Sequence, residues 1–256
     1  MARRRNSNRR RRGSFGFLYK LLSILVICGA IVAAVTLFFR VDQVEIFGEG
    51  RYTEEEIRQA SAIEDGDNLY LLNKNTVVSR IRAKLPYIEE IRINRKLPDT
   101  LVIEVKECGR PFALVQDGSA WLISPKGMIV DQLEESAAAD YGVISGCQLL
   151  APTVGTQLAL ATEYASQQRS LLDLLAALEE AEMLEDVDGI RLDDLSAIRM
   201  DYVGRFTVKM PYGADYATKL KLLRMAMESE VVQDNMTGTF DMMREDGRTY
   251  LDQSTR

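Results

Sequence analysis

The stretch IRINRKLPDTLVIEVKE, residues 91–107, decides the fold of the first part of the chain. Its side chains alternate in character on both sides of a Leu-Pro-Asp-Thr turn. The positions that share a face are Ile91, Ile93 and Arg95 before the turn, and Leu101, Ile103 and Val105 after it. Period-two alternation is typical of half-buried strands, and Pro-Asp is typical of turns. The stretch therefore predicts an antiparallel hairpin.

The residues before the hairpin predict one strand and two helices. VDQVEIFG (residues 41–48) alternates like a strand. Thr53 followed by Glu56 forms the capping-box pattern of a helix start. A second helix is expected over residues 74–85, because its apolar residues recur at helical spacing and a proline follows it. The predicted order is strand, helix, helix, strand, strand, which is enough for a small two-layer domain.

A run of 19 uncharged residues, LLSILVICGAIVAAVTLFF (21–39), precedes this unit. A helix of that length rises about 28 Å, close to the hydrocarbon thickness of a bilayer. The alternative is a cleaved signal peptide, whose apolar region is usually shorter and ends at a small-residue cleavage site. This run continues through Leu37-Phe38-Phe39. We therefore predict a retained signal anchor.

The charges are divided unevenly along the chain. The formal net charge is -6, yet residues 1–40 hold nine Lys or Arg and no acid, which leaves 23 bases against 38 acids in the rest. The arginines that precede the span are Arg3, Arg4, Arg5, Arg9, Arg10, Arg11 and Arg12. Positive residues beside a span favour a cytoplasmic N-terminus, so we expect the remainder to be extracytoplasmic. Nucleic-acid binding by the arginines is the alternative, but attraction to anionic lipid is the simpler account beside a membrane.

Composition argues against several kinds of chemistry. The sequence has no histidine, which removes Ser-His-Asp and Cys-His catalysis and any histidine-liganded metal site. G-x-S-x-G, Walker, G-x-G-x-x-G and C-x-x-C motifs are also missing from the sequence. Cys108 and Cys147 could form a disulfide, but two cysteines are a poor disulfide framework, so we expect two free, half-buried thiols. We expect no catalytic residue, no cofactor, no metal and no small-molecule substrate.

From Pro111 onward the sequence becomes strand-rich. PFALVQDGSAWLISPKGMIVDQ (residues 111–132) contains apolar segments separated by two turn signals. Trp121 is expected to pack in the core, with a sugar-stacking platform as the alternative. Residues 134–155 indicate a looser segment.

A long helix is predicted from about Leu158 to Met183. Its apolar stripe consists of Leu160, Tyr164, Leu171, Leu175 and Leu178. The remaining predicted elements are strands at 197–202 and 205–210, a helix at about 215–229, and a closing hairpin with strands at 239–243 and 248–251 that turns at Glu245-Asp246-Gly247.

Binding of a partner protein fits this sequence better than catalysis does. Asp188 with Asp193 or Asp194 is the acid pair that a wall hydrolase would need. Their polar surroundings favour solvated surface acids, because buried carboxylates need partners. An acidic body also disfavours nucleic acid and anionic wall polymers. A short strand at the C-terminus would instead end a sheet, and its edge could accept a strand from another protein.

The order and motifs of the chain resemble the FtsQ/DivIB family of bacterial cell-division proteins. V-x-x-V-x-I-x-G (41–48) is similar to the first strand of a POTRA domain, the polypeptide-transport-associated fold, and residues 86–107 are similar to its closing hairpin. Arg110-Pro111-Phe112-Ala113 resembles the junction into the family's second domain. The junction sequence Glu107-Cys108-Gly109-Arg110-Pro111 has two residues more between its Glu and Arg than the Glu-Arg-x-Pro that is usual in the family. Gly238-Thr239-Phe240-Asp241 and the last hairpin also resemble the family.

The resemblance implies an α+β protein with an N-terminal transmembrane helix. Its parts would be a cytoplasmic basic tail (1–20), a transmembrane helix (21–39), a POTRA domain of β-α-α-β-β order (41–110) and an FtsQ/DivIB-type β domain (111–256). The last part would be mixed α/β and strand-rich, with a C-terminal antiparallel hairpin.

The resemblance also implies a function. The protein would be a non-enzymatic divisome scaffold that binds FtsL- and FtsB/DivIC-like proteins and helps recruit or regulate septal peptidoglycan synthesis. It would be a single-pass protein of the cell membrane at the division septum. In the family, the FtsB partner adds a strand to the end of the second domain. Carried onto this chain, that edge is Thr249, Tyr250, Leu251 and Asp252, with Tyr250 either an apolar anchor for the partner or a plain core aromatic.

Two other functions stay open at this point. One is a chaperone-like POTRA protein that binds extended secreted polypeptides through the edge of its first sheet. The other is a membrane-anchored wall hydrolase that uses paired acids.

Overall fold

The computed structural model of the chain describes residues 15–48, 50–229, 232–233, 235–244 and 249–253. The seven N-terminal arginines and the turn predicted at Glu245-Asp246-Gly247 lie outside the described residues. The helices are α1 (Phe15–Phe38), α2 (Glu54–Ser61), α3 (Lys74–Lys84), α4 (Ala165–Glu180) and α5 (Tyr216–Met227), with 3-10 helices at Glu135–Asp140, Thr162–Tyr164 and Leu184–Asp186. The strands are β1 (Gln43–Phe47), β2 (Ile88–Lys96), β3 (Thr100–Glu107), β4 (Phe112–Gln116), β5 (Ser119–Ile123), β6 (Ile129–Glu134), β7 (Gly142–Ser145), β8 (Val187–Arg191), β9 (Ala197–Tyr202), β10 (Phe206–Pro211), β11 (Gly238–Asp241) and β12 (Tyr250–Gln253).

The chain divides into two compact units. The first unit consists of Met1–Glu45, Glu64–Asn73 and Asn94–Val102. The second unit consists of Ile46–Ile63, Lys74–Ile93 and Ile103–Arg256. The division crosses all three strands of the N-terminal sheet.

Helix α1 is the apolar run that the sequence singled out. Within the described part of the chain it is the one helix long and apolar enough to cross a membrane, and its window Gly16–Thr36 has a mean hydropathy of 2.4. None of that window is buried against the rest of the protein. An uncovered apolar rod of 21 residues spans about 31 Å, which matches the hydrocarbon core of a bilayer.

The capping box that was predicted for the first short helix is confirmed. The backbone N–H of Glu56 donates to Thr53 Oγ1 at 3.3 Å, and Glu56 Oε2 accepts from the backbone N–H of Thr53 at 2.8 Å. These two bonds satisfy N–H groups that a helix start would otherwise leave without partners. Helix α2 buries Ile57 and Ala60.

The predicted hairpin is confirmed as β2 and β3, with β2 beginning three residues earlier than the alternation indicated. The sheet has the order β1-β3-β2. Ile93, Leu101 and Ile103 are buried, as the alternation predicted, whereas Arg95 on the same face is half-buried. Because β3 is the central strand, both of its neighbours contribute to burying its side chains.

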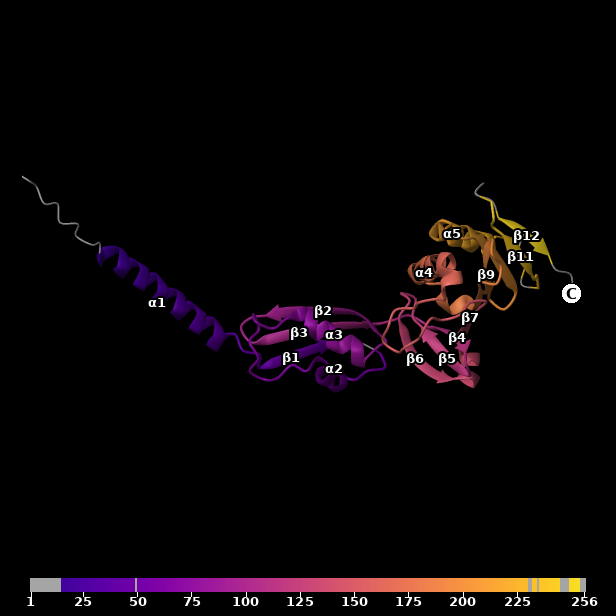
Figure 1. The fold of residues 1–256 in the computed structure, drawn as a ribbon. Helices are drawn as coiled ribbons and strands as arrows, with labels where there is room; N and C mark the ends of the chain where they lie inside the picture. The colour runs from indigo at the N-terminus through magenta and orange to yellow at the C-terminus, as the bar shows by residue number, and fades with distance from the viewer. Residues whose placement is uncertain (1–14, 49, 230–231, 234, 245–248, 254–256) are drawn as a thin grey trace, which may run out of the picture. The chain divides into compact units, whose positions relative to one another are not determined.

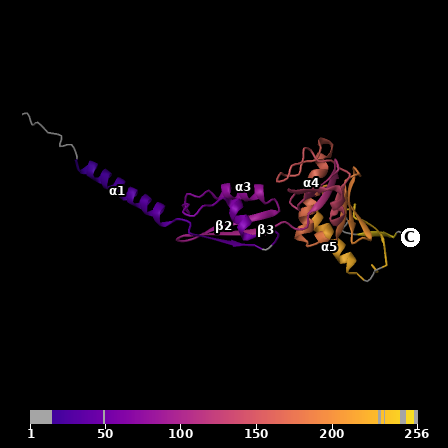
Figure 2. The same cartoon turned by 90° about the horizontal axis from the view of Figure 1, so that it is seen from below.

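The rest of the chain builds one nine-stranded sheet with the order β12-β11-β10-β9-β8-β7-β4-β5-β6. The helices α4 and α5 lie together on one face of this sheet (Figures 1 and 2). Their buried residues, among them Leu171, Leu175 and Leu220, form one core with the sheet. Trp121 packs partly buried against that core, in agreement with the packing interpretation.

Two central strands were not predicted. Residues 134–155, expected to be a looser segment, contain β7, which pairs in parallel with both β4 and β8. Strand β8 was also missed. Both strands are short, and each carries a glycine. They gain their partners from segments far away in sequence, so local alternation does not reveal them.

The predicted start of the long helix at Leu158 is wrong. Helix α4 begins at Ala165, so Leu160 and Tyr164 precede it. The backbone at Leu158 and Leu160 bonds elsewhere: Leu158 N donates to Gly127 O at 2.7 Å, and Gln168 Oε1 accepts from Leu160 N at 2.8 Å. Those bonds hold residues 158–160 in an extended course, and Leu160 is buried without being helical.

Candidate partner-binding edge and its sheet face

Strand β12 is the last strand at one end of the nine-stranded sheet. It pairs antiparallel with β11, in the register Gly238 with Gln253, Thr239 with Asp252, Phe240 with Leu251 and Asp241 with Tyr250. Strand β11 in turn pairs in parallel with β10. No further strand lies beyond β12 in the described part of the chain, so its outer side is the place where another strand could pair.

The two faces of β12 differ in what they touch. Leu251 is half-buried and packs against the core, next to Phe240, which is 1% exposed. Successive side chains of a strand point to opposite faces, so Tyr250 and Asp252 point away from the helices. Tyr250 is 40% exposed and Asp252 is exposed. The alternative that Tyr250 is a plain core aromatic is therefore wrong.

The four predicted edge residues are thus brought together, but in different roles. Thr249 is half-buried and precedes the strand, and Leu251 holds β12 to the core. Tyr250 and Asp252 are the two side chains that face outward. The guanidinium of Arg244 lies 5.2 Å from the centre of the Tyr250 ring, a cation–π distance.

Gly238 allows β12 to approach β11 closely. A Cβ at this position would collide with the carbonyl oxygen of Asp252 in the facing strand. Backbone atoms cannot move aside as the end of a flexible side chain can, so a larger residue would push β12 away from the sheet. The small residue that begins β11 is therefore part of what builds the edge.

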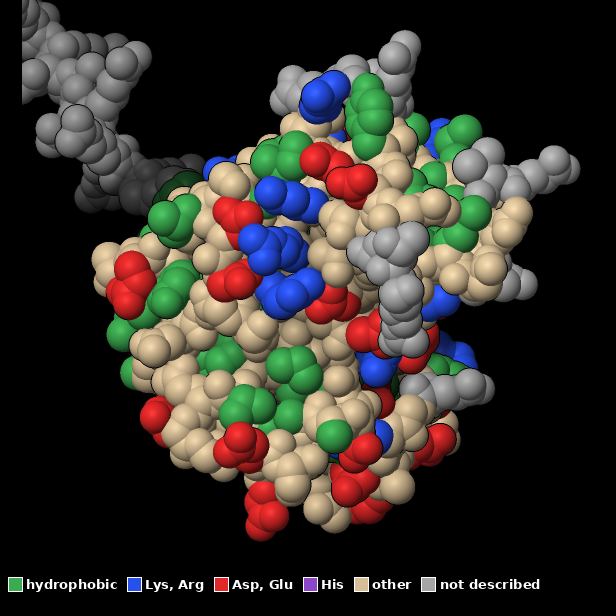
Figure 3. All heavy atoms as spheres, turned by 90° about the vertical axis from the view of Figure 1, so that its right-hand side faces the viewer, with side chains coloured by type: hydrophobic (Ala, Val, Ile, Leu, Met, Phe, Trp, Pro, Cys, Tyr) green, Lys and Arg blue, Asp and Glu red, His purple; other side chains and the backbone are tan. Residues whose placement is uncertain are grey.

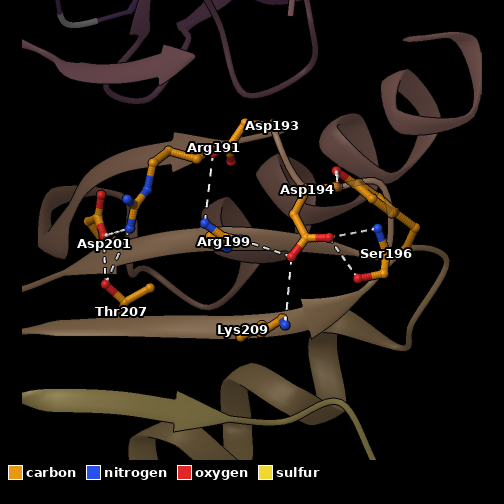
Figure 4. A network of polar contacts seen from close by, with 9 residues as sticks. Arg191, Asp193, Asp194, Ser196, Arg199, Asp201, Thr207 and Lys209 are labelled. Atoms are coloured by element: carbon orange, nitrogen blue, oxygen red, sulfur yellow. Dashed lines mark hydrogen bonds and ion pairs between the residues drawn. The ribbon is translucent and has the colours of Figure 1, made fainter. Parts of the chain in front are cut away.

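A polar network that was not predicted lies on β8, β9 and β10, on the sheet face opposite α4 and α5 (Figure 4). Asp194 accepts from Arg199 Nη2 at 2.9 Å, and its Oδ2 lies 3.6 Å from Lys209 Nζ. Arg199 and Lys209 stand directly opposite each other on β9 and β10. Two like charges opposite each other are unfavourable, and the shared Asp194 carboxylate offsets that repulsion.

A second ion pair continues the network. Arg191 Nη2 donates to Asp201 Oδ1 at 2.7 Å, and Thr207 Oγ1 donates to the same oxygen at 2.9 Å. Figure 3 views the molecule from the side opposite α4 and α5 and shows basic side chains in a column with acidic ones beside them. The signal in the sequence was that polar residues alternate with apolar ones in each strand: Arg199 and Asp201 in β9, and Thr207 and Lys209 in β10.

Asp188 and Asp194, two of the acids named for a hydrolase pair, each bond to other groups. Asp194 is held by Ser196, whose backbone N–H and hydroxyl both donate to it, and by Arg199. These hydrogen bonds hold the pKa of Asp194 well below its ordinary value. Asp188 accepts instead from the backbone N–H of Gly204. The two carboxylates have separate partners, and Asp194 is fixed in its charged form, which does not suit a proton donor.

The two thiols that follow α1, those of Cys108 and Cys147, are half-buried and are not joined in a disulfide. Burial raises the pKa of each to about 12. A thiol with so high a pKa is a poor nucleophile at neutral pH. Within the described residues, no group of three or more Cys, Asp or Glu side chains is placed to hold a metal ion.

These features define a class of protein: an apolar helix suited to membrane anchoring is followed by a β-α-α-β-β unit and a mixed sheet. The family model for the POTRA domain of FtsQ type matches residues 39–107. The chain is 32% identical over 189 residues to the cell division protein FtsQ of Syntrophotalea carbinolica. The alignment covers 73% of this chain and 64% of that protein. It is 34% identical over 98 residues to the cell division protein DivIB of Clostridium botulinum, covering 38% of each.

A third relative is the cell division protein FtsQ of Geobacter sp. strain M21, 28% identical over 173 residues, covering 68% of this chain and 58% of the relative. Each alignment spans less than two thirds of the relative's length. The chain is thus related to the FtsQ and DivIB cell division proteins, and its residues 39–107 match the POTRA domain of FtsQ type.

Proposed function

We propose that the protein is a non-enzymatic scaffold of the cell-division machinery, anchored by α1 with its N-terminus in the cytoplasm. The names of the relatives and the uncovered apolar helix support the anchoring and the division role. The arginines before α1 support the orientation, because positive residues stay on the cytoplasmic side. The remaining residues would then act outside the membrane, at the septum, as a POTRA domain (41–110) and a β domain (111–256).

The partner site that we propose is the outer side of β12. An FtsB/DivIC-like protein would add a strand there, and FtsL would join the same complex, so that septal peptidoglycan synthesis is recruited or regulated. The observation that carries this proposal is the position of β12 at the end of the sheet with Tyr250 and Asp252 facing outward. Main-chain hydrogen bonds would supply affinity, and the outward side chains would supply specificity.

The test measures binding of the full-length protein in nanodiscs to an FtsB/DivIC-like partner. Tyr250→Glu places a charge where an apolar contact is expected, and affinity should fall at least about tenfold, which is roughly 1.4 kcal/mol. Leu195→Glu is the matched control, since Leu195 is 86% exposed and lies outside the edge. Removal of residues 248–256 should abolish binding. Undiminished affinity in both edge variants would reject the β12 site.

Two further measurements separate the proposal from its alternatives. A fluorescent fusion of the full chain should gather at midcell, and uniform membrane fluorescence would count against the division role. A peptide array should show preference for the division partner. Equal binding of many unrelated extended peptides would instead favour the chaperone-like POTRA function, through the edge of the first sheet.

A further inference from the structure

The turn at residues 68–72 is fastened to the last turn of α1. Asn68 Nδ2 donates to Val35 O at 3.1 Å, and Leu69 N donates to Phe39 O at 2.9 Å. The rings of Phe39 and Tyr70 meet edge to face, with their centres 5.0 Å apart. All of these residues belong to the first compact unit. The turn therefore holds a fixed position at the end of the apolar helix.

The shape of this turn is itself fixed by Asn68. Its Oδ1 accepts from the backbone N–H of Tyr70 at 2.9 Å and from that of Leu71 at 3.1 Å. Such a side chain-to-backbone turn orders the residues that follow it. Leu69 is fully buried, whereas Leu71 is 76% exposed and Tyr70 is 47% exposed. The turn thus presents two large apolar side chains away from the protein.

The tip of the β2–β3 hairpin is tied to the same place in the chain. Asp99 O accepts from the backbone N–H groups of Asp42 and Gln43, at 2.9 and 3.3 Å, directly after the end of α1. Leu97, at this tip, is 54% exposed. A third apolar side chain is therefore presented by a segment that is hydrogen-bonded to the residues after α1.

The level of these side chains relative to a bilayer follows from α1. The apolar window ends at Thr36, and its length of about 31 Å fills the hydrocarbon core. Phe39, three residues further on, then lies in the interfacial layer, and Tyr70 contacts it. Tyrosine is enriched at that layer because its ring is apolar and its hydroxyl is polar.

We propose that Tyr70, Leu71 and Leu97 insert into the interfacial layer of the lipid bilayer next to α1, so that the first unit rests on the membrane. The inference depends on the anchoring part of the proposed function and not on the partner site. Each exposed apolar side chain would then gain burial that the protein alone does not give it.

The charged residues near the end of α1 favour an apolar contact with lipid over an electrostatic one. Arg40 is exposed and could meet a lipid phosphate, but Glu64 and Asp65 lie on the neighbouring turn and are also exposed. Acids beside the patch would be repelled by anionic lipid. The contact should therefore form on vesicles of phosphatidylcholine alone.

The test inserts the full chain into phosphatidylcholine vesicles, with and without bromine near the headgroup end of the acyl chains. Leu71→Trp adds a fluorophore at the turn, and the parent chain, with Trp121 as its single tryptophan, gives the background. Leu195→Trp is the control, since Leu195 is 86% exposed in the second unit. Leu97→Trp is a second probe that keeps the test decisive if the first variant does not fold.

The added emission of Leu71→Trp should shift to the blue and should be quenched by brominated lipid, whereas that of Leu195→Trp should stay unquenched. Protein that floats with the vesicles but shows no quenching at Leu71 or at Leu97 would overturn the interface contact alone. Protein that does not float with the vesicles would overturn the anchoring as well. The two failures are thus distinguishable.

Discussion

Phe240 on β11 stands directly opposite Leu251 on β12, and both side chains belong to the core that α4 and α5 cover. The Phe240 ring lies 4.9 Å from that of Phe206, so the contact continues inward through the sheet. Strand β12 is held to the core by the face that carries Leu251, whereas the adjacent Tyr250 lies on the opposite face. Stability and the proposed partner recognition therefore depend on neighbouring residues of the same strand pair.

The first prediction separates those two roles. Phe240→Ala should lower the free energy of unfolding by about 3–5 kcal/mol, because it removes a fully buried ring from the core. Tyr250→Ala should lower it by less than about 1 kcal/mol, since that ring is substantially exposed. Chemical denaturation in detergent, followed by Trp121 fluorescence, measures both. Similar losses for the two variants would contradict the assignment.

The second prediction concerns the pH dependence of the polar network. Hydrogen bonds from Ser196, and then from Arg199, lower the pKa of Asp194 in the folded protein. Because the pKa is lower in the folded protein, the charged Asp194 carboxylate contributes its full stabilisation above the ordinary aspartate pKa of about 3.9. That contribution is lost as the pH falls towards the pKa of Asp194 in the folded protein. The wild type should thus be more stable than Asp194→Asn at neutral pH, and the difference should shrink below about pH 4.

Unfolding free energies of both proteins at several pH values check this point. Asp173→Asn is the matched control, because Asp173 is an exposed acid on α4 whose carboxylate lies 3.9 Å from Arg169. A surface pair of that kind contributes little. A difference between wild type and Asp194→Asn that grows as the pH falls would show that the sign is wrong.

The third prediction tests the capping box of α2. Thr53→Ala removes the hydroxyl that accepts from Glu56 N, and it should destabilise α2 by about 1 kcal/mol. Thr53→Ser keeps the hydroxyl and should behave nearly as the wild type does. Amide hydrogen exchange of residues 54–61 reads the effect locally. Equal protection in Thr53→Ala and the wild type would mean that the cap contributes nothing.

The fourth prediction concerns the two thiols outside α1. Burial raises the pKa of Cys108 and Cys147 to about 12, and only the thiolate reacts with iodoacetamide. Both should be alkylated slowly in the native protein at neutral pH and rapidly after denaturation, without prior reduction. Mass spectrometry of the labelled peptides measures the rates. Labelling after denaturation that required a reductant would reveal a disulfide instead.

Much of the architecture could be predicted from local patterns. The apolar run that becomes α1, the Thr53–Glu56 cap, the alternating hairpin around residues 97–100 and the closing strand pair each depend on residues close together in the chain. Solvation, helix capping and strand alternation act over a few residues, so the sequence carries them directly. The candidate edge was placed by the resemblance of residues 238–241 and of the closing hairpin to the family.

The remaining features depend on partners far apart in sequence. Strands β7 and β8 pair in parallel at the centre of the sheet, α4 starts late because residues 158–160 bond to other segments, and Arg199 meets Lys209 and Asp194 only across strands. The exposure of Tyr250 and the fastening of Asn68 to α1 are of the same kind. By itself the sequence determined the apolar helix α1, the local elements and the family resemblance. Tertiary structure alone decided which side chains face outward, because exposure depends on the segments that pack around a residue.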